Sequence, residues 1–339
     1  MTKKSTSTRR FFNYKTLLGI GISFLGLYLG FRKFDAREFF ASLRETDLIL
    51  FFLSMLVMVF TVFLRSIRWK FLVNPLKKVP LKDLFGSEMV CYFGNNVFPL
   101  RLGEVLRAYS LSKITKLSSA SIFGTIVVER FLDVLFFLII LPAAALLFPA
   151  MPVWIRWSGI VSGAVLVVLV LLYYLYQYKQ ASFRRYLNHK LHSLSYTKFL
   201  DIIRKFLSGV RTLRNTPHAG LIVFWTVIIW AVNIFNYWLI GTSLHVFFSL
   251  QELLLIFFVT SAIISIPSAP GYVGTYHAGA IGILVILGYE LNQAQVIAVI
   301  LHAAGFLSLT FIGFIYFLKY HIALKETTDI KTPYVEYEN

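Results

Sequence analysis

The sequence predicts an all-α polytopic membrane protein, with six transmembrane helices and two re-entrant helical hairpins arranged as an inverted repeat. Three observations lead to this prediction. Of the 339 residues, 58% are hydrophobic and only 14% are charged, whereas soluble domains are about 25% charged. Six apolar segments are long enough to cross a bilayer. Two shorter ones each stop at a proline and glycine cluster, and the clusters lie 171 residues apart (Pro99 and Pro270).

Each predicted crossing is an apolar run bounded by polar or charged residues. About 20 residues cross the hydrocarbon core, and tilt or snorkelling accommodates shorter and longer runs. The six runs are approximately 16–31, 48–64, 118–148, 157–178, 219–246 and 294–318. They form one membrane domain, 16–318, which follows a basic N-terminus, 1–15, and precedes a short tail, 319–339.

Two apolar stretches, 84–98 and 253–266, are about fifteen residues long and too short for a crossing. Each is stopped by proline and glycine and is followed by another short helical stretch, so each is predicted to be half of a hairpin. The residues leave open whether a hairpin re-enters on one side or consists of two thin complete crossings. Both alternatives leave the following segment on the same side of the membrane.

Basic residues predict the orientation, because short loops rich in Lys and Arg stay in the cytoplasm. If each hairpin enters and leaves on one side, both termini and 27 of the 33 Lys and Arg residues fall inside. The loop 179–218 carries nine of them and one acid, Asp201, so we expect it to contact the anionic inner leaflet. The basic composition of this loop is explained equally well if its charge only keeps the loop on the cytoplasmic side. The predicted location is the cytoplasmic membrane of a prokaryote.

The apolar segments repeat around the two proline and glycine clusters. Gly103 and Gly274 share the offset of 171 residues, and Glu129 precedes His302 by 173. This spacing predicts an internal duplication, although apolar helices also resemble one another by chance. Three crossings lie between equivalent segments. Because this number is odd, the two halves are inserted in the membrane with opposite orientations. The halves are about 16–148 and 157–318.

The helix breaks are the predicted binding region. Proline ends a helix and leaves backbone groups without partners, which in a bilayer must face protein or water. A helix that starts near Gly103 or Gly274 points its positive end at that space, where a phosphate can bind. Arg101 and Arg107 add positive charge, and Glu104 either neutralises one of them or meets a cationic head group. We therefore expect a substrate site at Asn96, Pro99, Arg101, Gly103, Glu104, Arg107, Pro267, Pro270, Gly271 and Gly274.

Further candidates lie inside the apolar segments. Glu129, Arg130 and Asp133 fall near mid-membrane, where a charge is costly and must face protein or water. They either line a cavity or relay protons, or they neutralise one another as a structural group, since Arg130 and Asp133 are three residues apart. His277 and His302 either line the same space and titrate, or are hydrogen-bonded core histidines.

The net charge of +17 and the single cysteine exclude other classes of site. The basic residues lie between apolar runs and form no basic face with stacking aromatics, so we expect no nucleic acid partner. Anionic lipid head groups are the expected counter-charge. A lone cysteine, Cys91, excludes a disulfide within the chain and a cysteine-based metal cluster. We expect no metal and no cofactor.

At these residues the chain resembles the lysylphosphatidylglycerol synthase transmembrane-region family, whose members are flippase-like integral membrane proteins. The match covers nearly the whole chain and rests on N-V-F-P-L-R-L-G-E (96–104), E-R-x-x-D (129–133) and P-x-x-P-G-x-x-G (267–274). The resemblance implies paired re-entrant helices that move lipids or lipid-linked head groups between leaflets. Some members carry a C-terminal aminoacyl transferase, but only the tail 319–339 follows here, so we expect no synthase activity. Some members have glutamate where this chain has His277, which argues against a lysyl-lipid cargo.

Three functions are compatible with these features. The first is a translocase whose polar groove spares a phosphate-bearing head group the loss of its hydration. The second is a membrane-embedded enzyme acting on lipid phosphates or polyprenyl-linked sugars. The sequence lacks H-E-x-x-H, G-x-S-x-G and metal-spaced acids, so we expect no catalysis. The third is an accessory subunit of a separate lipid-modifying enzyme. No G-x-x-x-x-G-K-[ST] loop is present, so transport is expected to be downhill or coupled to ions or voltage. The sequence also leaves open whether the protein forms a homo-oligomer.

Overall fold

The computed structural model of the protein describes residues 14–98, 101–147, 153–178, 218–265 and 268–322. Within these ranges the chain forms eleven α-helices and one short 3-10 helix, with no strand. This confirms the predicted all-α class. The chain divides into two compact units. The first comprises Met1–Ile126 and Ile228–Asn339, and the second comprises Val127–Val227.

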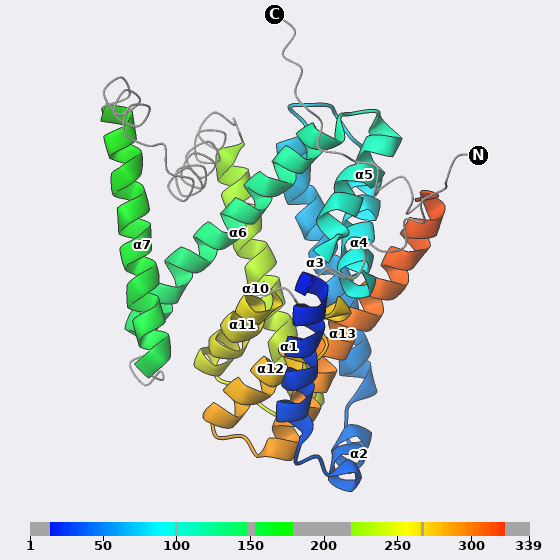
Figure 1. Ribbon diagram of the computed structural model, residues 1–339, viewed down its shortest axis with the longest axis vertical. Coiled ribbons are helices and arrows are strands. Elements are labelled where there is room, and N and C mark those ends of the chain that lie inside the picture. Colours follow the sequence, from blue (N-terminus) through cyan, green and yellow to red (C-terminus); the bar gives the residue numbers. More distant parts are fainter. Residues whose placement is uncertain (1–13, 99–100, 148–152, 179–217, 266–267, 323–339) are drawn as a thin grey trace, which may run out of the picture. The chain divides into compact units, whose positions relative to one another are not determined.

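The helices follow the apolar segments of the sequence (Figure 1). In chain order they begin with α1 (Tyr14–Phe31), α2 (Ala36–Arg44), α3 (Leu48–Val73), α4 (Leu81–Val97), α5 (Gly103–Thr115), α6 (Ser119–Leu147) and α7 (Val153–Tyr178). They continue with α10 (Ala219–Ser243), α11 (Leu250–Ile264), the 3-10 helix η3 (Pro270–Tyr272), α12 (Thr275–Ile286) and α13 (Leu291–Lys319). All six predicted crossings are helical over most of their described residues.

Three described helices, α3, α10 and α13, are long and apolar enough to cross a membrane. α6 is longer than α10, but Glu129, Arg130 and Asp133 interrupt its apolar sequence. The described parts of α1 and α7 contain shorter apolar stretches, Gly19–Phe31 and Arg156–Val168. The helices thus have the composition of a multi-pass membrane protein, and three of the six predicted crossings meet the length and apolarity that a crossing requires.

α3 is longer than the sequence predicts. Its apolar run stops at Leu64, yet the helix continues to Val73 and buries both Arg65 and Arg68. The guanidinium carbon of Arg65 lies 5.3 Å from the ring centroid of Trp230 on α10. In the sequence the first arginine marks the end of the apolar segment, but a guanidinium can be buried against an aromatic ring, so the helix continues past it.

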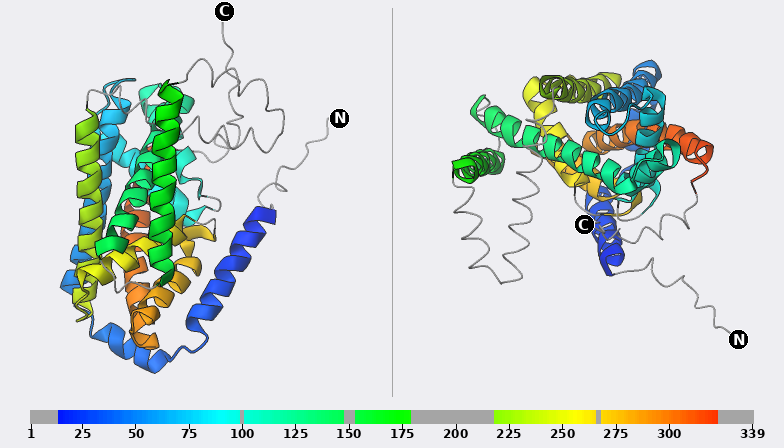
Figure 2. Two further views of the ribbon diagram at one scale, coloured as in Figure 1. Left: turned by 90° about the vertical axis from the view of Figure 1, so that its left-hand side faces the viewer. Right: turned by 90° about the horizontal axis from the view of Figure 1, so that it is seen from above.

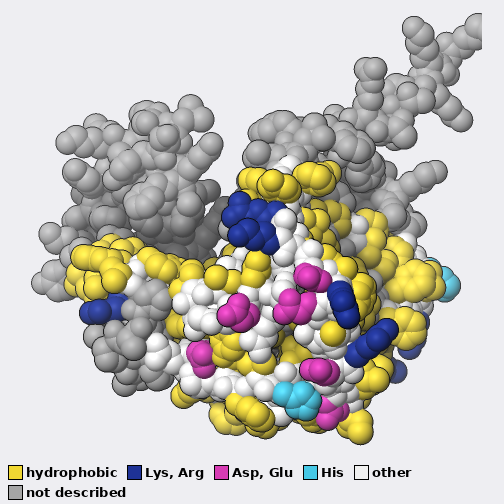
Figure 3. All heavy atoms as spheres, turned by 90° about the horizontal axis from the view of Figure 1, so that it is seen from below, with side chains coloured by type: hydrophobic (Ala, Val, Ile, Leu, Met, Phe, Trp, Pro, Cys, Tyr) yellow, Lys and Arg dark blue, Asp and Glu magenta, His cyan; other side chains and the backbone are white. Residues whose placement is uncertain are grey.

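A short helix that is not among the predicted segments, α2, joins α1 to α3. The Asp35 carboxylate caps α2 by accepting hydrogen bonds from the amides of Arg37 (2.9 Å) and Glu38 (3.1 Å). Asp47 caps α3 in the same way. Carboxylates suit these positions because the N-terminus is the positive end of a helix dipole. Figure 3 views the molecule from this end and shows acidic and basic side chains interspersed.

α3 and α10 lie side by side and antiparallel. The amide of Asp47, just before α3, donates to the carbonyl of Ser243 at the end of α10 (2.8 Å). Farther along α3, Arg65 contacts Trp230, which lies nearer the start of α10. Four helices also recur 169 to 172 residues later: α3, α4, α5 and α6 begin at Leu48, Leu81, Gly103 and Ser119, and α10, α11, α12 and α13 begin at Ala219, Leu250, Thr275 and Leu291. This recurrence supports the predicted duplication.

Both pairs of short helices pack against α13. α4 runs antiparallel to its C-terminal half, with Met89 against Gly313 and, farther along α4, Asn96 donating to Thr310 (2.8 Å). α12 packs against its N-terminal half. α1 is inclined to the other helices of the first unit in Figure 2 and packs against α12. One long helix, drawn in orange, therefore contacts both pairs.

Close packing holds α3, α4 and α13 together. Val62, Met89 and Leu309, one from each helix, form a buried apolar cluster. Lipid tails are as apolar as these side chains, so in a bilayer shape complementarity and dispersion contribute more to this contact than the hydrophobic effect does. Gly313 allows the α4 backbone to approach α13.

The variant Gly313→Ala is expected to lower the midpoint of thermal unfolding in detergent. The added methyl group would clash with the carbonyl oxygen of Met89 and lie 2.7 Å from Cβ of Phe93. Such overpacking costs about 1–3 kcal/mol. Gly282→Ala is the control, because nothing lies within 4 Å of a methyl group there and alanine favours a helix over glycine. Equal midpoints for the two variants would contradict the close contact of α4 with α13.

Candidate functional site

Two helix breaks lie in the first unit. The first separates α4 from α5, and the second separates α11 from α12 and contains η3. Pro99 and Pro267, both predicted site residues, lie outside the described residues. Pro270 is the first residue of η3, where its fixed φ suits the start of a helical turn. The sequence therefore predicted the position of both breaks correctly.

The two breaks contact each other. A Cβ atom on Gly271 would lie 3.2 Å from the carbonyl oxygen of Asn96, so the backbone of the second break touches the end of α4. The guanidinium carbon of Arg101 lies 5.6 Å from the ring centroid of Tyr272, within the range of a cation–π interaction. Three predicted site residues from opposite halves of the chain, Asn96, Arg101 and Gly271, are thus brought together.

Each break holds a non-glycine residue in the left-handed region of backbone space. The φ angles are 55° for Arg101 and 58° for Tyr272. An L-residue with a side chain pays about 1–2 kcal/mol for this conformation, and such residues cluster at ligand sites. These are the same two residues whose side chains meet.

Asn95, at the end of α4, forms hydrogen bonds across the first break to the start of α5. Its side-chain oxygen accepts a hydrogen bond from the amide of Gly103 (2.9 Å), and its side-chain nitrogen donates to Glu104 (3.4 Å). A Cβ atom on Gly103 would clash with the carbonyl oxygen of Cys91, so glycine is needed for α5 to begin this close to α4. The hydrogen bond of Glu104 is therefore with an amide rather than with either of its predicted arginine partners.

Ser23 of α1 contacts the backbone of the second break. Its hydroxyl oxygen accepts a hydrogen bond from the amide of Ala269 (2.8 Å). Its carbonyl oxygen would clash with a Cβ atom on Gly274, whose φ of 93° also favours glycine. α1 therefore packs directly on the backbone at the point where α12 begins.

His302 of α13 faces the second break. Its Nε2 lies 2.7 Å from the carbonyl oxygen of Gly271. A carbonyl only accepts hydrogen bonds, so Nε2 carries the hydrogen and donates it. The ring centroid of His302 lies 4.8 Å from that of His277, in the first turn of α12, and 5.1 Å from that of Tyr276. His277 is 7% exposed, and its Nδ1 is buried without a hydrogen-bond partner.

Both breaks lie against the middle third of α13. His302 binds Gly271 of the second break, and Thr310 accepts a hydrogen bond from Asn96 of the first. The two α13 residues are about 12 Å apart along the helix axis at 1.5 Å per residue. We call this region the hairpin junction, and it consists of Asn96, Arg101, Gly271, Tyr272, His277 and His302.

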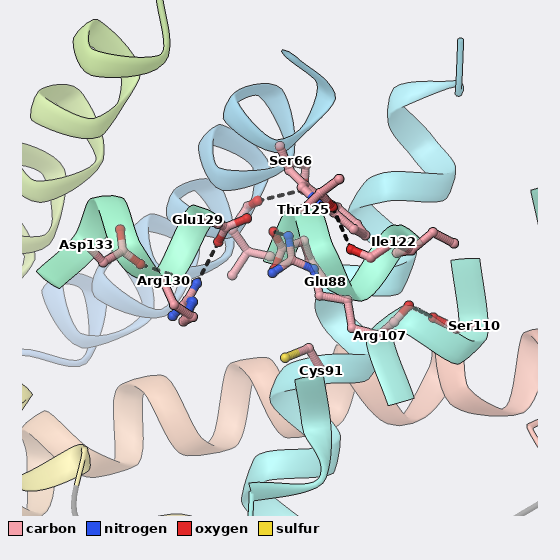
Figure 4. Close-up of polar contacts among 12 residues, drawn as sticks. Ser66, Glu88, Cys91, Arg107, Ser110, Ile122, Thr125, Glu129, Arg130 and Asp133 are labelled. Carbon is pink, nitrogen blue, oxygen red and sulfur yellow. Dashed lines mark hydrogen bonds and ion pairs between the residues drawn. The ribbon is translucent and has the colours of Figure 1, made fainter. Parts of the chain in front are cut away.

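Arg107 lies one turn into α5, in the contact with α4. Its guanidinium is 2.5 Å from a carboxylate oxygen of Glu88, and neither side chain is more than 2% exposed. The guanidinium carbon also lies 3.7 Å from the ring centroid of Trp69 on α3, whose Nε1 donates to Thr125 (2.9 Å). Figure 4 shows Glu88 and Arg107 pointing toward each other. Arg107 is thus part of a buried ion pair that joins α4 to α5.

Glu129, Arg130 and Asp133 form an ion-paired group on α6 (Figure 4), within the second unit. The Arg130 guanidinium lies 2.5 Å from Glu129 and 3.3 Å from Asp133, which confirms the predicted pairing of Arg130 with Asp133. The Glu129 side chain is fully buried, whereas that of Arg130 is 43% exposed. This geometry is compatible with both predicted roles, a cavity wall and a self-neutralising structural group.

Glu88 and Arg68 are not among the charges that the sequence predicts to be functional or structural. Glu88 is the one acid within the short apolar stretch 84–98, and Arg68 is completely buried in α3. A charge inside an apolar helix needs a partner. That signal alone identifies Glu88 as a candidate partner for a nearby arginine such as Arg107.

The hairpin junction combines groups that suit an anionic head group. It contains a guanidinium, an asparagine amide and two imidazoles beside aromatic rings. Guanidinium and amide donors bind phosphate oxygens directly. The described part of the chain contains no group of three or more His, Cys, Asp or Glu residues placed to hold a metal ion. The donors at the junction are therefore of the kinds that bind anions.

Comparisons with known proteins agree with a membrane protein. The family model described as "Lysylphosphatidylglycerol synthase TM region" matches residues 16–313. A UPF0104 membrane protein from Methanothermobacter thermautotrophicus is 21% identical over 284 residues, which are 80% of this chain and 83% of the relative. A UPF0104 membrane protein from Methanocaldococcus jannaschii is 37% identical over 97 residues, 28% of each chain. No solved structure matches the chain.

The variants Glu88→Ala and Arg107→Ala are each expected to destabilise the protein by about 3–5 kcal/mol, because each leaves a buried charge without its partner. The double variant Glu88→Leu/Arg107→Met is expected to unfold at a higher temperature than either single variant, since it removes both charges and keeps the volume. Unfolding in detergent, followed by circular dichroism, measures the differences. Lys82→Ala, at an exposed position of α4, is the control and should change stability by less than about 0.5 kcal/mol. A double variant less stable than both single variants would contradict the ion pair.

Proposed function

Since the chain belongs to the family of the lysylphosphatidylglycerol synthase TM region, we propose that it is a lipid translocase of the cytoplasmic membrane. It moves a phosphate-bearing lipid or a lipid-linked head group between leaflets and leaves it chemically unchanged. The observation that carries the proposal is the meeting of two helix breaks at the middle of one long helix.

The length of α13 supports this proposal. The helix has 29 residues, about 43 Å at 1.5 Å per residue, and the hydrocarbon core is about 30 Å thick. A crossing helix of this length carries its middle third near the midplane. The hairpin junction would then offer polar groups at the depth where a charged head group is most costly to move. Interrupted helices that meet at the midplane are typical of transport sites.

The four short helices support two re-entrant hairpins. α4, α5, α11 and α12 have 17, 13, 15 and 12 residues, fewer than the roughly 20 that a crossing needs. We infer that each hairpin enters and leaves on one side of the membrane. The six crossings would be α1, α3, α6, α7, α10 and α13. α3 and α10, which begin corresponding sets of four helices, run antiparallel, as an inverted repeat requires.

Charge at the ends of the first unit supports an orientation with both termini in the cytoplasm. Lysines gather where α3, α5 and α13 end: Lys77 donates to the Thr115 carbonyl (2.8 Å), and Lys113 donates to the His321 carbonyl (2.7 Å). At the opposite end, around α2, acids offset the basic residues. The positive-inside rule assigns the lysine-rich end to the cytoplasm.

Arg101 is the proposed counter-charge for the head group. Its Nε is buried without a hydrogen-bond partner, and its guanidinium contacts the ring of Tyr272. A guanidinium prefers a phosphate, with which it forms paired charge-assisted hydrogen bonds, to the face of a ring. A phosphate entering the junction can therefore replace the ring contact while the lipid tails stay in the hydrocarbon.

The membrane potential is one source of direction for such transport. A mono-anionic lipid that moves alone is driven outward by about 2.3 kcal/mol per 100 mV in an inside-negative membrane. A net-cationic lipid is driven inward by the same amount per charge.

The variant Arg101→Ala is expected to slow lipid exchange at least tenfold in liposomes that contain the purified protein. Head-group-labelled phosphatidylglycerol reports exchange through quenching by an impermeant reagent, and mass spectrometry reports whether the lipid is altered. The loss is expected because the phosphate then crosses without its counter-charge. Arg44→Ala removes an exposed arginine from α2 and is the matched control, expected to retain the exchange rate of the parent protein.

Three results would contradict the proposal. The first is no exchange above that of empty liposomes by the parent protein. The second is an equal rate for Arg101→Ala and Arg44→Ala, which would remove the hairpin junction from the mechanism. The third is a chemically altered lipid, which would favour a membrane-embedded enzyme.

A further inference from the structure

The histidine pair, His277 and His302, has no role yet in the proposed translocation. The rings lie 4.8 Å apart, centroid to centroid, beside the second break. His302 is tied to that break through Gly271. Gly271 in turn lies against Asn96 and next to Tyr272, which contacts Arg101. Two consecutive residues, Gly271 and Tyr272, therefore connect the pair to Arg101 at the proposed phosphate site.

The hydrogen bonds of the pair leave room for one more proton. Nε2 of His302 already holds a hydrogen, because it donates to a carbonyl, so in the neutral ring Nδ1 is an acceptor. Nδ1 of His277 is buried, with no hydrogen-bond partner. A proton can add to either ring without breaking the hydrogen bond to Gly271.

The described groups that contact the pair are uncharged. Tyr276 on α12 faces His302, and its hydroxyl lies 3.4 Å from that of Tyr237 on α10. Phe31 on α1 faces His277 and does not ionise. On α11, Thr260 lies 2.8 Å from the Tyr237 hydroxyl and does not ionise either. Tyr272 on η3 contacts Arg101, with Glu104 beyond it on α5. Among the described residues no carboxylate contacts either ring.

A positive charge on this pair therefore has no contacting carboxylate among the described residues, and an arriving anion can balance it. An imidazolium in an apolar interior is disfavoured, and two of them at this separation would repel each other strongly. A phosphate at Arg101 would bind at the same junction as the pair, and its negative charge would favour one imidazolium. Two ligands of opposite charge that bind close together in a medium of low polarity each increase the affinity of the other.

We propose that the His277–His302 pair binds one proton together with the anionic head group, so that this protein couples lipid movement to protons. The inference rests on the proposed translocase function and specifies its coupling ion. One proton and one mono-anionic lipid form a unit without net charge. The distribution of the lipid would then follow the pH difference across the membrane, and the membrane potential would have little effect on it.

Binding measurements on the purified full chain in detergent test this proposal. Short-chain phosphatidylglycerol is titrated between pH 5.5 and pH 8, a range in which its phosphodiester keeps its charge. The affinity is expected to fall as the pH rises, by up to about tenfold per pH unit, the limit for one linked proton. A pH indicator in weakly buffered solution is expected to report uptake of up to one proton per lipid bound.

The variants His277→Gln and His302→Gln, alone and combined, are expected to flatten this dependence. Glutamine keeps hydrogen-bonding groups at each position but takes up no proton in this range. His245→Gln, at an exposed histidine, is the control and is expected to keep the full dependence. A combined variant that keeps the dependence of the parent protein would overturn the assignment to this pair.

The outcomes separate this inference from the proposed function. Lipid binding and exchange without pH dependence or proton uptake would overturn proton coupling and leave the translocase standing. Proton-linked lipid binding without exchange in liposomes would support the pair as a proton site and overturn the translocase. No binding at any pH would overturn both. A lipid distribution that responds to the membrane potential but not to a pH difference would also overturn proton coupling.

Discussion

A helix break in an apolar interior releases backbone amides and carbonyls, and each of them needs a hydrogen-bond partner. In this protein side chains from three helices supply the partners. Asn95 of α4 binds the Gly103 amide, Ser23 of α1 binds the Ala269 amide, and His302 of α13 binds the Gly271 carbonyl. The arrangement of α1, α4 and α13 around the breaks follows from this requirement. Glycine permits it because the backbones approach more closely than a Cβ atom allows.

Buried charge obeys the same rule and separates two arginines that look equivalent in the sequence. Arg107 has a carboxylate partner in Glu88 and a ring in Trp69, so its charge is balanced inside the protein. Among the described residues, Arg101 contacts the ring of Tyr272 and forms no ion pair. A ring is a weaker partner for a guanidinium than a carboxylate or a phosphate. Arg107 therefore suits a structural role, and Arg101 suits a ligand that comes and goes.

The proposed function depends on the contrast between these two environments. Ion pairs and close helix packing hold α3, α4, α5 and α13 in place, whereas at the hairpin junction the charge of Arg101 rests on a ring contact that an anion can replace. Two junction residues also hold a costly backbone conformation. A translocase needs a site that binds a head group strongly enough to admit it but not so strongly that it cannot leave. In the proposed mechanism, the histidine pair balances the charge of the lipid during that passage.

The sequence by itself determined the helical class, the apolar segments, both breaks and the spacing that relates the two halves. These features follow from local rules, because hydropathy and proline act over a few residues and leave a visible pattern. The pattern also identified Arg130 and Asp133 as partners, since three residues along a helix bring side chains together.

Only the tertiary structure decided which distant residues meet. It paired Arg107 with Glu88 rather than Glu104, set Arg101 on Tyr272, joined His277 to His302, and extended α3 past its first arginine. The physical reason is that a buried polar group is satisfied by whichever partner the packed helices bring within reach. In this fold that partner often lies on another helix, at a separation along the chain that no local pattern records.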